Sequence, residues 1–231
     1  MKKRTTVREY IRRLGYTPPS DETYDHIDEW LDWYQGEVEK FHKYKVWNGI
    51  HVRECKRMTL GMAKKVCEDW ANLILNEKVS IKAGEYEPRL NEILEKNNFR
   101  VRANQLVEVA YALGTGAFVE YLAGDEVMID YIRADMIIPL AWDNGDITEC
   151  AFGSYKSMDG EEYVYVQLHR LGREEEGENP GQYFIENRYV NAETGEEVEP
   201  PADVIPVIAT GSERPLFQII MPNIQNNIDL D

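Results

Sequence analysis

The sequence predicts an α+β fold in which N-terminal helices precede an antiparallel β meander. In the first half, apolar side chains recur three and four residues apart, which is the spacing of one helix face. In the second half, apolar and polar side chains alternate, as they do along half-buried strands. Helices followed by strands, without regular alternation of the two, argue against a doubly wound parallel sheet.

Two amphipathic helices are expected before residue 36. The first ends at Gly15, and the second follows Ser20, whose hydroxyl can cap it, and stops near Gly36. The apolar faces are Val7, Tyr10, Ile11 and Leu14 in the first helix, and Ile27, Trp30, Leu31 and Tyr34 in the second.

A loop rich in aromatic and basic residues is expected next, from Phe41 to Arg57, before the strongest helix of the chain. That helix should run from about Thr59 to Asn76. Its expected buried stripe consists of Ala63, Val66, Cys67, Trp70 and Ile74.

A short strand is predicted from Val79 to Lys82, before two further helices. One of them should contain Leu90, Ile93 and Leu94, and the other should end at Gly114. The apolar residues of the last helix are Ala103, Leu106, Val109, Ala110 and Leu113.

The strands of the second half are marked by alternation and by turn residues. Asn144-Gly145 and Asp159-Gly160 each lie between two apolar runs and are typical of tight hairpins. Alternating stretches cover residues 127–132 and 163–170, and a further strand from Gln182 to Val190 should end at the turn Glu193-Thr194-Gly195.

The chain is expected to have three parts. Residues 1–113 should be mainly helical, residues 114–199 should form the antiparallel sheet, and residues 200–231 are rich in proline and asparagine. We expect Pro222–Asp231 to contain no closing helix or strand, as in a chain cut from a longer one.

The net charge of −16 argues against tight binding of nucleic acid, because an acidic surface repels phosphate. The charge is uneven. Residues 1–20 carry six basic residues against Glu9, and residues 171–199 carry nine glutamates against Arg173 and Arg188. Both segments can be interpreted as solvated surfaces or as docking surfaces for different partners.

Three cysteines without a CxxC pair (Cys55, Cys67 and Cys150) indicate a reducing compartment. The basic start MKKR is not followed by an apolar segment, and no apolar run is long enough to cross a bilayer. These features predict a soluble protein that is neither secreted nor bound to a membrane.

No catalytic, cofactor-binding or metal-binding residues are predicted. The motifs of serine hydrolases, P-loop proteins, zinc proteases and dinucleotide-binding proteins are absent. Gly114-Thr115-Gly116 follows a helix and is best explained as a helix stop. The four histidines (His26, His42, His51 and His169) are scattered, and His169 is best explained as a sheet residue.

Two adjacent acid pairs, Glu68-Asp69 and Glu161-Glu162, are expected by chance in a chain with 42 acidic residues. The segment Phe41–Arg57 mixes aromatic and basic side chains, a mixture also found in nucleic-acid-binding surfaces. We favour a loop that packs its aromatic side chains on neighbouring helices.

Several strings, taken in order, resemble the portal proteins of long-tailed bacteriophages of Gram-positive bacteria. The most characteristic is the stretch from Leu60 to Asn72, which continues to Asn76-Glu77. The others are Trp33–Gly36, Phe41–Tyr44, Trp47–Gly49, Gly114–Ala117, Ala134-Asp135, Trp142–Gly145, Pro222-Asn223 and Asp229–Asp231. The resemblance covers nearly the whole chain.

The resemblance implies the N-terminal wing of a subunit of the portal ring, typically a dodecamer, at one capsid vertex. The ring would contact the terminase large subunit, neck or adaptor proteins and capsid proteins. DNA would pass through its channel without sequence-specific binding. Members of this family continue into a stem and a clip, which are expected to be missing here, and they have no catalytic residues. The subunit would be found in the virion, and in the host cytoplasm during assembly.

A second interpretation is an acidic DNA mimic or adaptor that binds a basic DNA-binding protein. Its support is the net charge and the acid-rich segment from Asp21 to Glu39. Salt-sensitive binding to such a basic protein would distinguish it from a portal wing.

Overall fold

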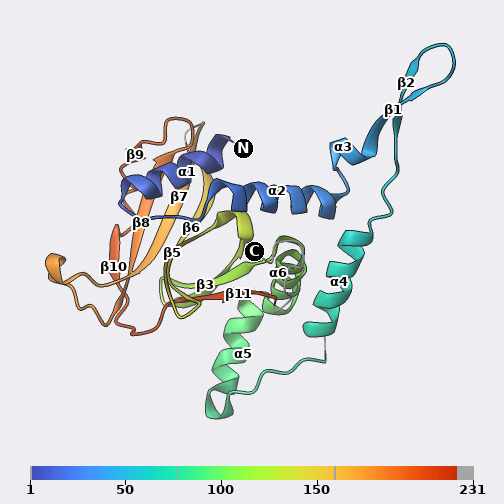
Figure 1. Ribbon diagram of the computed structural model, residues 1–231. Coiled ribbons are helices and arrows are strands. Elements are labelled where there is room, and N and C mark those ends of the chain that lie inside the picture. Colours follow the sequence, from blue (N-terminus) through green and yellow to red (C-terminus); the bar gives the residue numbers. More distant parts are fainter. Residues whose placement is uncertain (1, 77, 159, 223–231) are drawn as a thin grey trace. The chain divides into compact units, whose positions relative to one another are not determined.

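A computed structural model describes residues 2–76, 78–158 and 160–222 (Figure 1). It confirms the α+β class. The chain divides into two compact units. The first consists of Met1–Thr23 and Ala117–Ile219, and the second of Tyr24–Gly116 and Ile220–Asp231. The division of the chain at residues 113 and 199 remains a prediction.

The first unit contains the predicted meander as an antiparallel sheet in the order β10-β8-β7-β6-β5, with β9 paired to β8. Asn144 and Gly145 both have positive φ, 50° and 90°, so the predicted type I′ turn joins β5 to β6. Asp159 lies outside the described residues. The strands are β5 (Ile137–Asp143), β6 (Asp146–Met158), β7 (Glu161–Leu171), β8 (Tyr183–Asn191), β9 (Glu197–Val198) and β10 (Val207–Ala209).

A second sheet of the same unit has three strands in the order β11-β3-β4. A buried cluster joins residues of the two sheets, including Val119, Phe152 and Phe217. The strands are β3 (Gly116–Ala123), β4 (Glu126–Arg133) and β11 (Phe217–Ile220), and short 3₁₀ turns span Ala134–Met136 and Glu174–Glu176.

Strands β10 and β11 were not predicted, because prolines interrupt this part of the sequence. Each is an edge strand, where a neighbouring proline costs no ladder hydrogen bond. The expected absence of regular structure in Pro222–Asp231 concerns residues that lie almost entirely outside the described part.

Helix α1 (Lys2–Arg13) contributes Val7, Tyr10 and Ile11 to the core of the first unit, as predicted. The Tyr10 hydroxyl donates a hydrogen bond to Glu197 at 2.8 Å. Leu14, expected on the same face, is 37% exposed because the helix ends before it.

The second unit is mainly helical, as predicted for this part of the chain. Helix α4 packs against α6, where the rings of Trp70 and Tyr111 stack at 5.8 Å. Gly114 ends α6 with φ of 85°. The elements are α2 (Asp21–Gln35), α3 (Glu39–His42), β1 (Lys43–Trp47), β2 (Val52–Lys56), α4 (Met62–Ile74), a 3₁₀ turn (Gly84–Tyr86), α5 (Glu87–Lys96) and α6 (Phe99–Leu113).

Three details of this unit differ from the predictions. The stretch Val79–Lys82 is not a strand, since no neighbouring strand pairs with it among the described residues. The expected loop Phe41–Arg57 contains the antiparallel hairpin β1–β2, in which Lys43 pairs with Lys56 and Trp47 with Val52.

The third difference concerns α4. Cys67 and Ala71 are its buried residues, whereas Ala63, Val66, Trp70 and Ile74 are exposed. A helix that packs against one other helix buries a narrower stripe than its apolar residues can supply.

Candidate assembly surface

The hairpin and the residues that anchor it form an exposed arm, which we define as residues 41–57. Asn48 begins its turn, and its side-chain oxygen accepts hydrogen bonds from the backbone N–H groups of Ile50 and His51 at 3.0 and 2.9 Å. Gly49 has φ of 95°, which favours glycine there. Large apolar side chains near the turn are open to solvent, with Trp47 62%, Ile50 83% and Val52 54% exposed.

The base of the arm is held by aromatic and cationic contacts. The Arg57 guanidinium lies over the rings of Phe41 and Tyr44, at 4.9 and 4.8 Å from their centroids. Phe41 packs against Trp33 of α2 at 5.3 Å, and the buried His42 is bonded through Nδ1 to the Val38 carbonyl at 2.9 Å.

The expectation that this segment packs its aromatic side chains on neighbouring helices is therefore right at the base and wrong at the tip. Phe41 contacts α2, whereas Trp47 is carried outward on the hairpin. The Asn48-Gly49 turn between two β-prone stretches was the signal that could have revealed the hairpin.

The arm is basic in an acidic chain. It carries five basic side chains against Glu54, a balance of +4. Two of these cations have partners in the same unit, Lys43 with Glu39 at 2.6 Å and Lys45 with Glu54 at 3.6 Å.

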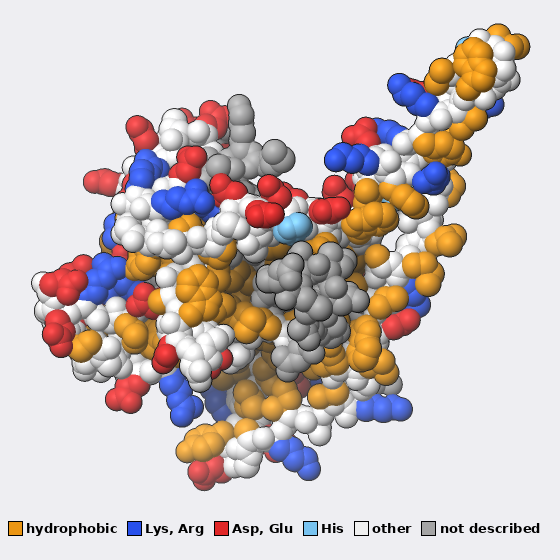
Figure 2. All heavy atoms as spheres, in the orientation of Figure 1, with side chains coloured by type: hydrophobic (Ala, Val, Ile, Leu, Met, Phe, Trp, Pro, Cys, Tyr) orange, Lys and Arg blue, Asp and Glu red, His pale blue; other side chains and the backbone are white. Residues whose placement is uncertain are grey.

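Exposed apolar side chains are concentrated around the arm and α4. Of the 25 large hydrophobic side chains exposed among the described residues, 17 lie between Trp33 and Val101. Figure 2 shows hydrophobic side chains gathered along the arm and α4. Large exposed apolar areas mark surfaces that bind another molecule.

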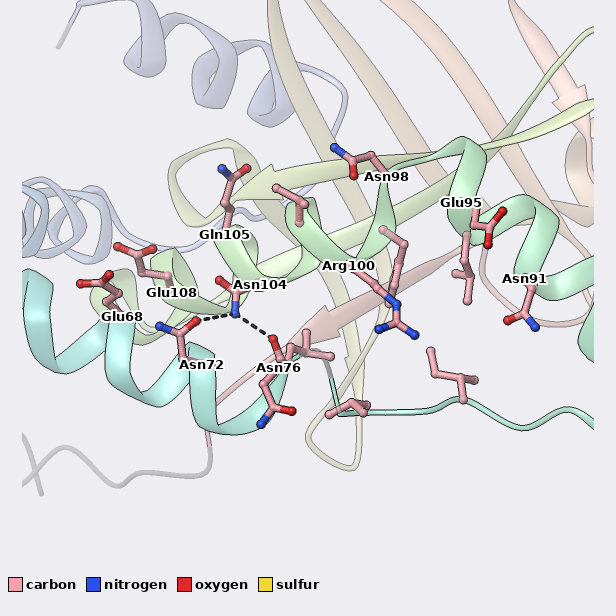
Figure 3. A pocket seen from close by; sticks show the side chains of 16 residues that line it. Glu68, Asn72, Asn76, Asn91, Glu95, Asn98, Arg100, Asn104, Gln105 and Glu108 are labelled. Atoms are coloured by element: carbon pink, nitrogen blue, oxygen red, sulfur yellow. Dashed lines mark hydrogen bonds between the residues drawn. The ribbon is translucent and has the colours of Figure 1, made fainter.

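A groove of about 770 Å³ lies in the same unit, beside the C-terminal end of α4 and against α5 and α6 (Figure 3). Its apolar lining is provided by Leu75, Val79, Ile81, Leu94, Phe99 and Val101. Its amide side chains are those of Asn72, Asn76, Asn91, Asn98, Asn104 and Gln105.

Charged groups of the groove give it an acidic balance, since Glu68, Glu95 and Glu108 outnumber Arg100. Asn104 donates through Nδ2 to the Leu75 carbonyl at 2.9 Å and to Asn72 at 3.3 Å, which ties α6 to α4. The Tyr34 hydroxyl donates to Glu108 at 2.6 Å, and burial together with this bond raises the pKa of Tyr34. This groove could not be predicted from the sequence, because it depends on how three helices pack.

Other residues singled out in the sequence form hydrogen bonds or ion pairs within the fold. The hydroxyl of Thr115, between Gly114 and Gly116, donates a hydrogen bond to the Ile220 carbonyl at 3.0 Å. Lys65 pairs with Asp69 at 2.8 Å and Glu68 at 3.6 Å. Glu161 accepts a hydrogen bond from the Tyr163 hydroxyl at 2.7 Å.

His169 is a sheet residue, as expected, and is fully buried between Phe152 and Phe217. Burial lowers its pKa from 6.5 to about 4. Within the described ranges, no cluster of His, Cys, Asp or Glu is suited to a metal ion, and no helix is long and apolar enough to cross a membrane.

The glutamate-rich segment 171–199 is more than a solvated loop. Glu178 and Glu186 bind the guanidinium of Arg170, whose side chain is 1% exposed. The hydrogen bond from Arg170 lowers the pKa of Glu178. In the basic segment 1–20, Arg8 and Arg12 pair with Asp21 at 2.8 and 3.1 Å.

The exposed apolar arm and the acidic groove have the features of surfaces that bind another molecule. Residues 16–204 match the family described as "Phage portal protein, SPP1 Gp6-like". The chain belongs to this family of phage portal proteins, which are structural proteins of the capsid connector. A search of curated proteins finds no match.

Proposed function

We propose that this chain is the wing of a portal subunit, which assembles with identical copies into a ring at one vertex of the capsid. The observation that carries the proposal is the family match over residues 16–204, which includes the arm and the groove. The exposed apolar surface of the second unit supports it, because a ring buries such surface between subunits.

The ring would be the conduit for DNA during packaging and ejection. A net charge of −16 suits this role, because an acidic wall repels the phosphate backbone and lets the duplex slide. The wing would also contact the terminase large subunit, neck or adaptor proteins and the capsid. ATP hydrolysis would belong to the terminase, so the chain itself would have no catalytic role.

The acidic DNA mimic is the weaker alternative. Its support was the net charge of −16 and the acid-rich segment Asp21–Glu39. Most of this segment is helix α2, in which Glu22, Asp25, Glu29 and Asp32 are exposed. Acidic residues on the solvated face of an amphipathic helix need no partner to explain them. Because α2 also lies within the region matched to portal proteins, we favour the portal function.

The position of the subunit in capsids tests the proposal. The gene would be expressed with the capsid proteins of its phage, and purified capsids would be labelled with a gold-conjugated antibody against a tag at residue 1. A portal subunit predicts gold at a single vertex of each capsid. Labelling spread over all vertices, or no labelling of capsids, would overturn the proposal.

A further inference from the structure

The arm has the properties of an element that requires a partner. Among the described strands, β1 and β2 pair only with each other, so both outer edges have backbone groups available. Apart from the half-buried Cys55, every residue of β1 and β2 is exposed. A two-stranded hairpin with so little packing is only marginally stable unless another surface covers it.

The groove has apolar, hydrogen-bonding and acidic side chains that complement the exposed groups of the arm. Its apolar lining can cover Trp47, Ile50 and Val52, which project near the turn. Its amide side chains provide donors and acceptors for the free edge of a strand. The balance of three carboxylates against Arg100 complements the arm, whose balance is +4.

We propose that the arm of one copy of this chain occupies the groove of the next copy. This inference rests on the proposed ring and names the two surfaces that would close it. The arm joins the N-terminal end of α4, and the groove lies beside its C-terminal end (Figures 1 and 3). A helix of 13 residues is about 20 Å long, which separates the arm from the groove of its own chain.

Two unlike surfaces at opposite ends of one helix make a heterologous contact. When such a contact repeats from copy to copy, it produces a ring if the rotation between neighbours brings the last copy back into contact with the first. Each copy in the ring would donate one arm and receive one, so no arm or groove would be left uncovered.

Cross-linking between two differently tagged copies tests the pairing. One copy carries Ile50→Cys on the arm and the other carries Val101→Cys in the groove, both in a Cys55→Ser background. Cys67 and Cys150 are buried and burial raises the pKa of both thiols, which keeps them unreactive. With a short bismaleimide, we expect a product that contains both tags.

The control replaces the groove cysteine with Leu122→Cys, whose side chain is 71% exposed and does not line the groove. It should give at least tenfold less of the doubly tagged product. Equal yields with Val101→Cys and Leu122→Cys, or no product with either, would overturn the pairing.

Charge exchange provides a second test that does not depend on cysteine geometry. Arg53→Glu on the arm should weaken association at least tenfold, and Glu95→Lys in the groove should restore it in the double variant. Failure of the second change to restore association would contradict the pairing.

Native mass spectrometry of the unmodified chain separates failure of this inference from failure of the portal function. If the unmodified chain forms rings but the doubly tagged cross-linked product does not appear, the pairing of arm and groove is overturned and the portal ring stands. A chain that stays monomeric at all concentrations would contradict both.

Discussion

At the scale of single residues, Arg170 carries a charge that solvent cannot reach. Its side chain is 1% exposed and is bound by Glu178 at 2.5 Å and by the buried Glu186. Glu186 is also held by Arg188 at 2.6 Å. Burial alone would raise the pKa of Glu186, but hydrogen bonds from Arg188 and Arg170 outweigh it and lower that pKa. The network is stable only while its charges remain paired.

Replacement of Arg170 by alanine should destabilise the first unit by about 3–5 kcal/mol, because Glu186 would lose its buried partner. Urea denaturation followed by tryptophan fluorescence measures the change. Arg214→Ala is the matched control, since this arginine is exposed in the same unit and its loss should change little. A loss of under about 1 kcal/mol in Arg170→Ala would contradict the importance of the network.

His169 predicts a pH dependence of stability. Its pKa is about 4 in the folded protein, because of burial, against an ordinary value of 6.5. Between these two values the unfolded chain binds a proton that the folded chain does not, so stability falls as the pH falls. The loss from this group reaches about 3 kcal/mol at pH 4.

The variant His169→Phe should remove that dependence between pH 6.5 and pH 5, where the carboxylates with lowered pKa values remain ionised. The new ring keeps the edge-to-face contacts with Phe152 and Phe217. Denaturation midpoints measured across this range provide the comparison. An unchanged slope in the variant would show that other groups cause the pH dependence.

Single residues that end or turn elements were the most predictable part of the sequence. Gly114 and the pair Asn144-Gly145 adopt the positive φ angles that their positions require. Ser20 accepts a long hydrogen bond of 3.4 Å from the Thr23 amide, as a cap does. Arg170 could not be recognised, because its burial depends on glutamates brought from two other segments.

At the scale of elements, α4 shows why its apolar residues could not be assigned to the core from the sequence. Its spacing correctly predicts a helix, but the width of the buried stripe depends on how many neighbours the helix has. Packing against α6 covers Cys67 and Ala71, leaves Val66 exposed, and leaves Trp70 45% exposed although its ring stacks on α6. The hairpin β1–β2 was not predicted for a related reason. Nearly all of its residues are exposed, so its strands do not cover a core and lack the alternating burial typical of half-buried strands.

The variants Ala71→Leu and Ala63→Leu test this assignment of the buried face. Ala71 is fully buried, so extra volume there should cost about 1–3 kcal/mol, whereas Ala63 is exposed and should tolerate leucine. The comparison uses urea midpoints of the two variants, which share one helix and one substitution. Equal effects would contradict the packing of α4.

At the scale of the whole molecule, charge distinguishes a conduit from a DNA-binding protein. The net charge of −16 predicts that duplex DNA binds weakly at physiological salt, with a dissociation constant above about 100 μM. Fluorescence anisotropy with a labelled duplex measures this. The basic arm could strengthen DNA binding, so the double variant Arg53→Glu, Lys45→Glu serves as the comparison. Tight, salt-sensitive binding that is lost in this variant would favour a nucleic-acid-binding arm.

Native mass spectrometry of the protein expressed from its own gene is the decisive measurement of whether copies of this chain assemble into a ring. The portal assignment predicts one dominant species, a closed ring of fixed stoichiometry, with a central opening in electron micrographs. A monomer at every concentration, or an open series of oligomers without a preferred size, would contradict it.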